Sequence, residues 1–322
     1  MSAVLSEVRR FALAHDLLPR GSMVLAACSG GPDSVAMVDL LDRLAGELGF
    51  VLAIASLDHG LRAESAREVA TVERLATELD RPFRKRRLAL RPGPGLQQRA
   101  RAARYRALEA LAAELGADRI ALGHTADDQA ETVLARLLRG AGVRGLGAMG
   151  PSRGTSSGLR LVRPLLTCRR GALRSHLERA SRDWVRDPSN EDPRFERTRL
   201  RRVLAQLEAE DARLVAHLSD LAEDARAHAA AVEVAAAALG ERPTREALRA
   251  APGAVRRTAI REWAARSGVT LGRAHLEALD ALVLGGRGAV LVPGGRQISL
   301  EGAALVLRPG PKRTRSSAPS DD

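Results

Sequence analysis

The sequence predicts an α/β protein with a doubly wound, mostly parallel sheet in its first domain and a second, smaller, mainly helical domain. Two observations lead to this prediction. Over roughly the first 180 residues, short β-branched or apolar runs alternate with longer amphipathic stretches, which is typical of strand-helix units. From about Arg194 the pattern changes to long helices rich in Ala, Leu, Glu and Arg. A length of 322 residues also favours two domains.

The first domain is expected to repeat a strand followed by a helix. The expected strands are Met23–Cys28, Val51–Leu57, Phe83–Leu90, Arg119–Gly123 and Leu159–Val162. The expected helices begin near Ser34, Glu64, Gln97, Ala126 and Arg169. This order predicts an open sheet that binds its ligands at the carboxyl ends of the strands.

The second domain is expected to end in a small hairpin. Strands at Ala289–Val292 and Gln297–Leu300 flank a Pro293-Gly294-Gly295 turn, and a third extended run covers Ala304–Leu307. The last residues are polar and carry Pro and Ser, so we predict disorder for them. The predicted parts are therefore 1–205, 206–310 and a tail at 311–322.

The charge of the chain favours a polyanionic partner. Lys and Arg number 51 against 39 Asp and Glu, a net charge of +12, and nearly all of the positive charge is arginine. Arginine forks match phosphate oxygens, and each phosphate contact releases counterions. A codon bias towards Arg and Ala would give the same composition, so both explanations stay open.

Composition also excludes several classes of protein. The two cysteines, Cys28 and Cys168, lie far apart and outside any Cys/His cluster, which argues against a disulfide framework, a zinc site and an iron–sulfur site. No apolar run approaches the roughly 20 residues of a membrane span, and charges interrupt the amino terminus. We therefore expect a cytoplasmic protein with no membrane partner.

A glycine-rich loop directly follows the first expected strand. Its sequence is Ser29-Gly30-Gly31-Pro32-Asp33-Ser34, and a helical pattern begins within it. Unpaired backbone N–H groups at such a helix start attract anions. The loop lacks the lysine of a Walker A motif, and alone it could be a turn with a capped helix.

Further polar segments end the second and fourth expected strands. They are Leu57-Asp58-His59-Gly60-Leu61-Arg62 and Gly123-His124-Thr125-Ala126-Asp127-Asp128-Gln129-Ala130-Glu131-Thr132. With the glycine-rich loop they resemble the N-type ATP pyrophosphatases, whose loop is called the PP-loop. Together with Arg101-Ala102-Ala103-Arg104-Tyr105 and Asp183-Trp184-Val185-Arg186-Asp187-Pro188-Ser189-Asn190, they resemble the tRNA(Ile)-lysidine synthetase family. This resemblance is strong over residues 20–205 and elsewhere rests on length and helical character.

The resemblance implies a ligase that forms a carbon–nitrogen bond on transfer RNA. ATP would adenylate the C2 oxygen of the wobble cytidine in an isoleucine tRNA with a CAU anticodon. Free L-lysine would then displace AMP to give lysidine. ATP and Mg²⁺ are the expected cofactors. Residues 206–310 are the expected tRNA-binding domain. A homodimer is a further possibility that the sequence leaves open.

The resemblance and the loop chemistry together assign the site residues. We expect Asp33 to hold Mg²⁺, although a carboxylate that only favours the helix start is the alternative. Catalysis is assigned to Asp33, His124, Asp128 and Arg101. Contact with ATP is assigned to Ser29, Gly30, Gly31, Pro32, Asp33, Ser34, His59 and Arg62.

Two carboxylates one helical turn apart are expected to select the lysine. Asp127 and Glu131 share a helical face, and no Lys or Arg occurs within Asp127–Thr132. A cationic ligand would relieve their repulsion, whereas the alternative is a first turn that complements the helix dipole. Thr125 and Asp128 have capping-box spacing, so Asp128 is expected to be partly structural.

Arginines on two expected helices are candidates for RNA contact. Arg101 and Arg104 could face a tRNA phosphate or the reacting cytidine, with a solvated face as the alternative. A stripe of Arg194, Arg197 and Arg201 could meet RNA phosphates. The sequence departs from the family at Gln97, where Glu is common, and at Thr198, where Asn is usual.

Two other functions remain open at this stage. A different PP-loop tRNA-modifying enzyme is one, but clustered cysteines for a thiolase and a glutaminase nucleophile for an amidotransferase are not seen. A non-catalytic RNA-binding protein on this scaffold is the other. The segment 140–145 fits G-x-G-x-x-G but follows a helix, so we interpret it as helix termination and loop, with no nicotinamide or flavin cofactor implied.

Overall fold

The computed structural model describes residues 2–58, 65–88, 93, 95–185 and 196–310. The chain divides into two compact units, Met1–Arg226 and a second unit from Ala227 onward, and this border falls within helix α9 (Leu214–Ala237). The border of the expected tRNA-binding domain at 205/206 stays a prediction. The predicted disorder of 311–322 lies outside the described residues.

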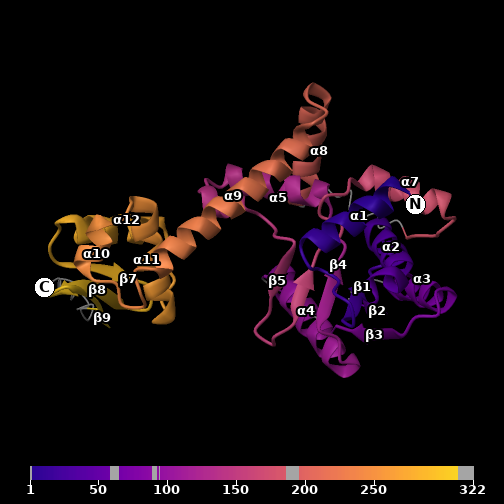
Figure 1. Cartoon of the computed structure of the whole chain (residues 1–322), viewed down its shortest axis with the longest axis horizontal. Helices are drawn as coiled ribbons and strands as arrows, with labels where there is room; N and C mark the ends of the chain where they lie inside the picture. The colour runs from indigo at the N-terminus through magenta and orange to yellow at the C-terminus, as the bar shows by residue number, and fades with distance from the viewer. Residues whose placement is uncertain (1, 59–64, 89–92, 94, 186–195, 311–322) are drawn as a thin grey trace, which may run out of the picture. The chain divides into compact units, whose positions relative to one another are not determined.

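A six-stranded sheet forms the centre of the first unit, in the order β3-β2-β1-β4-β6-β5 (Figure 1). All neighbouring strands are parallel except β5 and β6. The strands are β1 Met23–Ala27, β2 Val51–Asp58, β3 Phe83–Arg87, β4 Arg119–Leu122, β5 Ser152–Gly154 and β6 Arg160–Val162. The mostly parallel sheet is thus confirmed, and the antiparallel edge strand β5 was missed because it is short and lacks an apolar run.

Helices connect the strands of this sheet. The five predicted helix starts are confirmed to within two residues. These helices are α2 Pro32–Leu48, α3 Ser65–Glu78, α4 Leu96–Leu115, α5 Ala126–Leu138 and α7 Arg170–Arg179. Among the described residues, three more helices belong wholly to this unit, namely α1 Ala3–Ala14, the short α6 Val143–Leu146 and α8 Glu196–Glu210. The segment 140–145 therefore follows helix α5, as predicted, although α6 begins inside it.

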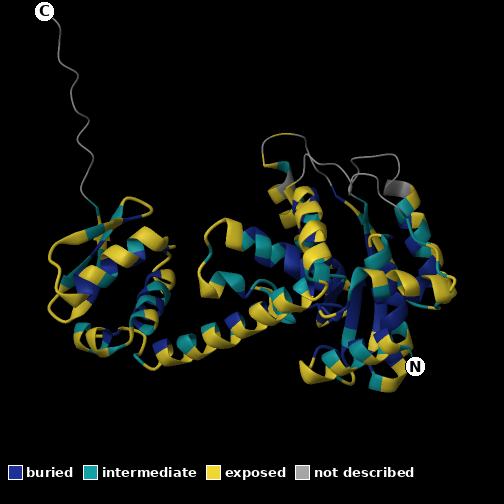
Figure 2. Ribbon diagram, turned by 90° about the horizontal axis from the view of Figure 1, so that it is seen from above, coloured by how far each residue is buried: buried dark blue, intermediate teal, exposed yellow. Residues whose placement is uncertain are grey.

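The inner strands β1, β2 and β4 are buried on both faces because their residues alternate between two apolar layers. Val24 and Ile54 pack into the layer that contains α1, α2, α3 and α7. Leu25 and Ile120 point the other way and pack against Leu108 on α4. Figure 2 shows the buried strands between helices with exposed outer faces. This double coverage explains why the inner strands are largely apolar in sequence, whereas the edge strand β3 is basic and mostly exposed.

The second unit combines helices with a small antiparallel sheet. Its elements are the end of α9, α10 Arg245–Ala250, α11 Gly253–Arg266, α12 Arg273–Leu284, β7 Ala289–Val292, β8 Arg296–Glu301 and β9 Ala304–Pro309. The predicted hairpin is confirmed. Gly294 and Gly295 both have positive φ, 83° and 64°, which only glycine adopts at little cost. In the part of the chain that the structure describes, no helix is long and apolar enough to cross a membrane.

Candidate nucleotide and substrate site

The glycine-rich loop is held closed by its own hydroxyl groups. Ser34 Oγ accepts a hydrogen bond from Ser29 N at 3.1 Å and donates one to the Gly31 carbonyl at 2.9 Å. Gly30 has a φ of 85°, and Gly31 caps α2 without a side-chain hydrogen bond. The amino end of α2 is thus left without a side-chain cap, and its backbone N–H groups can receive an anion.

Gly123 lets the end of β4 approach this loop closely. A Cβ atom at position 123 would lie 3.2 Å from Ser34 Cα and 3.3 Å from the Asp33 carbonyl oxygen, which is tighter than ordinary contact. Any larger residue would therefore push the two segments apart. The structure brings the loop and the His124–Glu131 segment together, as the sheet topology predicted, but the role of Gly123 was not foreseen.

Asp33 and His124 each have a buried atom with no hydrogen-bond partner. These atoms are Asp33 Oδ1 and His124 Nδ1, and no described residue satisfies either of them. Burial raises the pKa of Asp33, although Arg170 lies 3.5 Å from its other carboxylate oxygen and opposes this rise. Burial lowers the pKa of His124 to about 4, so the imidazole is neutral at pH 7. Both side chains retain unused capacity for a ligand.

Asp128 has a structural contact and an electrostatic one. Thr125 caps α5 and forms the predicted capping box with Asp128, with hydrogen bonds of 3.2 Å and 2.9 Å. The Oδ1 atom of Asp128 also accepts hydrogen bonds from Arg170 and Arg197. Burial opposes ionisation of this carboxyl, but the two guanidinium charges outweigh it and hold the pKa of Asp128 below its usual value.

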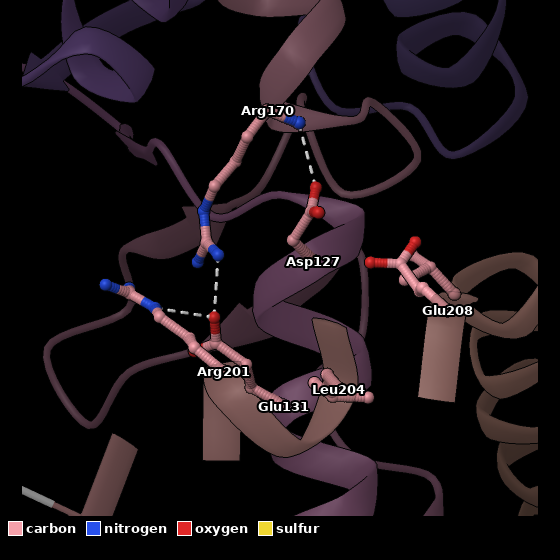
Figure 3. A pocket seen from close by; sticks show the side chains of 7 residues that line it. Asp127, Glu131, Arg170, Arg201, Leu204 and Glu208 are labelled. Carbon is pink, nitrogen blue, oxygen red and sulfur yellow. Dashed lines mark hydrogen bonds and ion pairs between the residues drawn. The ribbon is translucent and has the colours of Figure 1, made fainter. Parts of the chain in front are cut away.

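The window Asp127–Thr132 holds no Lys or Arg, but the folded protein places arginines from other elements against the acidic pair. Glu131 Oε1 accepts hydrogen bonds from Arg170 Nη1 at 2.7 Å and Arg201 Nε at 2.8 Å (Figure 3). Its Oε2 accepts one from Arg197 Nε at 2.6 Å. Asp127 accepts a hydrogen bond from the Arg170 backbone N–H at 2.8 Å. These arginines belong to α7 and α8, so a local sequence window could not include them.

Two members of the predicted stripe of Arg194, Arg197 and Arg201 are described by the structure, and contact of the stripe with RNA stays a prediction. Arg197 and Arg201 turn towards the carboxylates of α5 and do not form a free row of positive charge. Arg194 lies outside the described residues. The side chain of Arg197 is nevertheless 53% exposed, so contact with RNA stays a prediction for this arginine.

Arg169 and Arg170 are site residues that the sequence analysis missed. Arg169 is the N-cap of α7, and Arg170 is its first residue. Arg170 contacts Asp33, Asp128 and Glu131, and the attraction of these carboxylates outweighs burial and raises its pKa. Two positive charges at a helix amino terminus oppose the helix dipole. That local conflict was the signal that could have revealed them.

A pocket lies beside this network of ion pairs. Its lining combines carboxylates, guanidinium groups and apolar side chains from α5, α7, α8 and α9. The lining residues are Asp127, Glu131, Arg170, Arg201, Leu204, Glu208 and Val215 (Figure 3). Such a lining suits a ligand that carries both signs of charge and an aliphatic part.

The other predicted arginines lie on α4. Arg101 Nη2 lies 3.3 Å from Tyr105 Oη, and its guanidinium group lies 5.2 Å from the centre of the Tyr105 ring. Burial lowers the pKa of Arg104, and the charges of Arg101 and Arg197 lower it further. His59 and Arg62, the remaining predicted nucleotide contacts, lie outside the described residues, as do residues 186–190 and the side chain of Gln97.

Known proteins match both parts of this chain. Residues 6–208 match the family described as PP-loop domain, and residues 244–300 match the TilS substrate binding domain. The tRNA(Ile)-lysidine synthase of Methylobacterium nodulans is 41% identical over 317 residues, which are 91% of each chain. The chain belongs to the tRNA(Ile)-lysidine synthase family.

Other relatives match the first part of the chain. The tRNA(Ile)-lysidine synthase of Rhodopseudomonas palustris is 47% identical over 212 residues, 64% of this chain and 60% of that relative. The chain thus spans about three fifths of the length of the first curated relatives it matches. A solved U34-tRNA thiolase of Methanococcus maripaludis is 18% identical in sequence and matches with a TM-score of 0.58. The match covers 69% of this chain and 76% of the thiolase chain. At that identity the likeness shows the fold alone.

Proposed function

We propose that this chain is a carbon–nitrogen ligase that joins free L-lysine to the wobble cytidine of the isoleucine tRNA with a CAU anticodon. The observation that supports this most directly is the close approach at Gly123, which joins the anion-binding loop to the carboxylates of α5 in a chain of this family. The C2 oxygen of the cytidine would attack the α-phosphorus of ATP, and pyrophosphate would leave. The lysine amine would then attack C2, and AMP would leave with that oxygen.

The amino end of α2 is our proposed site for the phosphates of ATP. Its amide groups have no side-chain cap, and Ser29 and Ser34 keep the loop in the shape that exposes them. His124 is neutral at pH 7 because burial lowers its pKa to about 4. We assign to it an uncharged hydrogen bond to the nucleotide or the cytidine, which its unpartnered Nδ1 can make.

Asp33 fits the expected Mg²⁺ ion. Its Oδ1 atom is buried and has no partner among the described residues, so it offers an oxygen ligand that no residue there uses. Mg²⁺ typically binds one or two protein carboxylates and takes its other ligands from phosphates and water. When bound, the ion would neutralise charge on the departing pyrophosphate. Asp33 would hold it through an ionised carboxylate, the form that the nearby Arg170 favours.

The pocket beside α5 is our proposed site for lysine. The ammonium group would replace the exposed guanidinium of Arg197 at Glu131, while Asp127 adds a second carboxylate. Leu204 and Val215 would pack against the aliphatic part of the ligand. The exchange is feasible because an ion pair with a half-exposed arginine is weak compared with one that is fully buried.

The test is incubation of the full chain with ATP, labelled lysine and an isoleucine tRNA transcript with a CAU anticodon. We expect label in the RNA and one AMP for each lysine joined, whereas the same transcript with U at the wobble position should stay unlabelled. AMP release without label would favour another PP-loop tRNA-modifying enzyme. RNA binding without AMP would favour a non-catalytic binder. A homodimer and a cytoplasmic location stay predictions, and sedimentation of the purified chain would test the first.

A further inference from the structure

Two guanidinium groups lie over the single tyrosine of the chain. Tyr105 is on α4, with Arg101 at 5.2 Å and Arg153, from the edge strand β5, at 5.8 Å from the ring centre. Both distances are within the range of cation–π contact. The ring therefore gathers positive charge from two elements that are far apart in the sequence.

A third arginine is buried beside this pair. Arg163 follows β6 directly and is only 6% exposed. Its Nη1 atom donates to the Gly150 carbonyl at 2.7 Å, but its Nε atom is buried and has no partner in the described chain. Burial lowers the pKa of Arg163, and the charges of Arg153 and Arg101 lower it further. A buried guanidinium with an unused donor is costly unless an anion satisfies it.

The group defined by Arg101, Arg104, Arg153 and Arg163, which we name the Tyr105 arginine cluster, has no described counter-charge. Among the residues that the structure describes, no carboxylate forms an ion pair with any of its four members. Like charges held together in a partly desolvated place repel one another: burial is the main cause that lowers the pKa of Arg104, and the charge of Arg101 lowers it further. An anion bound there would remove this cost.

The cluster borders the proposed reaction site. The charges of Arg163 and Arg104 help to lower the pKa of His124, so both lie close to that imidazole. The loop proposed for the ATP phosphates belongs to β1 and α2, whereas the cluster is built from α4, β5 and the end of β6. The two anion-binding places are thus formed by different elements on either side of His124.

We propose that the Tyr105 arginine cluster binds a backbone phosphate of the RNA next to the nucleotide that reacts. This inference rests on the proposed function, because that function supplies the RNA. Guanidinium forks bind phosphate oxygens in a bidentate manner, and Arg101 and Arg153 are exposed for such contact. Arg163 adds a fixed positive charge from a buried position, where no described residue satisfies its Nε. The phosphate would neutralise the cluster and hold the wobble nucleotide beside His124.

Arg153→Gln is the primary test because Arg153 is exposed and its replacement should not disturb the core. We expect the full-length variant to bind the anticodon stem-loop of the isoleucine tRNA about tenfold more weakly than the unchanged chain. The plot of log affinity against log salt should become less steep, its slope decreasing in magnitude by about 0.7 to 0.9, because the variant neutralises one phosphate fewer. The ATP and lysine concentrations at half-maximal rate should not change.

Arg84→Gln is the matched control. Arg84 is an exposed arginine on β3, at the opposite edge of the sheet, and its substitution changes the net charge equally. It should leave affinity and salt slope unchanged. A second variant, Arg163→Lys, keeps the charge but removes both the buried Nε donor and the hydrogen bond to the Gly150 carbonyl that fixes the guanidinium group, so it should also weaken stem-loop binding.

The outcomes separate this inference from the proposed function. If the unchanged chain modifies RNA but Arg153→Gln behaves as Arg84→Gln does, the inference is overturned and the proposed function stands. A rise in the half-maximal ATP concentration with unaltered RNA affinity also overturns it, since the cluster would then serve the nucleotide. Weaker RNA binding by Arg153→Gln in a chain that joins no lysine supports the inference and removes the proposed function.

Discussion

Two groups of arginines in the first unit differ in what they face. Arg170, Arg197 and Arg201 converge on the carboxylates of α5 and bond to Glu131, whose side chain is only 4% exposed. In the Tyr105 arginine cluster, Arg163 is also buried, but among the described residues its guanidinium group bonds to the Gly150 carbonyl oxygen and to no carboxylate. The fold thus gives the first group of arginines a carboxylate counter-charge, whereas no described carboxylate pairs with the second group.

This difference shows what net charge can and cannot tell. The total of +12 predicts a polyanionic partner, but it does not say which arginines are available to that partner. The stripe of Arg197 and Arg201 had the better spacing for phosphates, yet the fold has paired it with carboxylates. Arg153 and Arg163 were not singled out, yet no described carboxylate pairs with them.

The largest effect should come from Asp33, which lies at the junction of the loop and the first arginine group. Asp33→Asn keeps the shape but removes the charge proposed to hold Mg²⁺, so the rate of AMP formation should fall by about 100-fold to 1,000-fold. Stem-loop affinity and melting temperature should be retained. Turnover close to that of the unchanged chain would remove Asp33 from the mechanism.

Glu131→Gln tests whether the first arginine group depends on its buried carboxylate. Three guanidinium groups would lose their shared counter-charge, and the free energy of unfolding should fall by about 3 kcal/mol. The melting temperature should then fall by about 6–12 °C, which calorimetry would measure. A decrease below about 1 °C would mean that these ion pairs contribute little and that the two arginine groups are energetically alike.

The pH dependence of stability tests His124, which lies between the groups. Its folded pKa of about 4 is below its ordinary value of 6.5, so between these values the unfolded chain binds a proton that the folded chain rejects. The free energy of unfolding should therefore fall, by up to about 3 kcal/mol, as the pH drops from 6.5 to 4. Asp33, whose pKa is raised, acts in the opposite direction at low pH. The contribution of His124 is the difference between the stability-versus-pH curves of the unchanged chain and of a His124→Gln variant. If the two curves run parallel between pH 6.5 and 4, His124 is not held neutral by burial.

Asp127→Asn tests the lysine pocket within the first group. An ammonium contact in a partly desolvated site contributes about 1.5–3 kcal/mol, so the lysine concentration at half-maximal rate should rise by roughly tenfold to 100-fold. The ATP dependence should stay nearly intact. A melting temperature that falls while the lysine dependence is unchanged would show that Asp127 only positions Arg169 and Arg170.

The smallest effect, and the one that most directly contrasts the groups, is expected for Arg104→Gln. Removing one charge from the Tyr105 arginine cluster should stabilise the free protein slightly, by up to about 0.5 kcal/mol in urea unfolding. This change in the free energy of unfolding is opposite in sign to the one expected for Glu131→Gln. A destabilisation of several kcal/mol would reveal a carboxylate partner and end the contrast between the two groups.

Local patterns were sufficient for much of the fold and of the nucleotide loop. The alternation of apolar runs predicted the strands because each face of a parallel sheet is buried, and Thr125 with Asp128 predicted the capping box three residues apart. The loop at 29–34 could be recognised because a strand, a glycine turn and a helix start are neighbours in the sequence. Such features depend on contacts within a few residues.

Contacts between distant residues were decided by the tertiary structure alone. Arg170 and Arg201 reach Glu131 across 39 and 70 residues of sequence, and Arg153 reaches Tyr105 from the missed strand β5. No window around Asp127 could show that its charge is neutralised, or that the charge of Arg163 is not. Electrostatic energy depends on distance in space and on burial, and for these side chains both are set by how α7 packs on α2, α8 on α5 and β5 on β6.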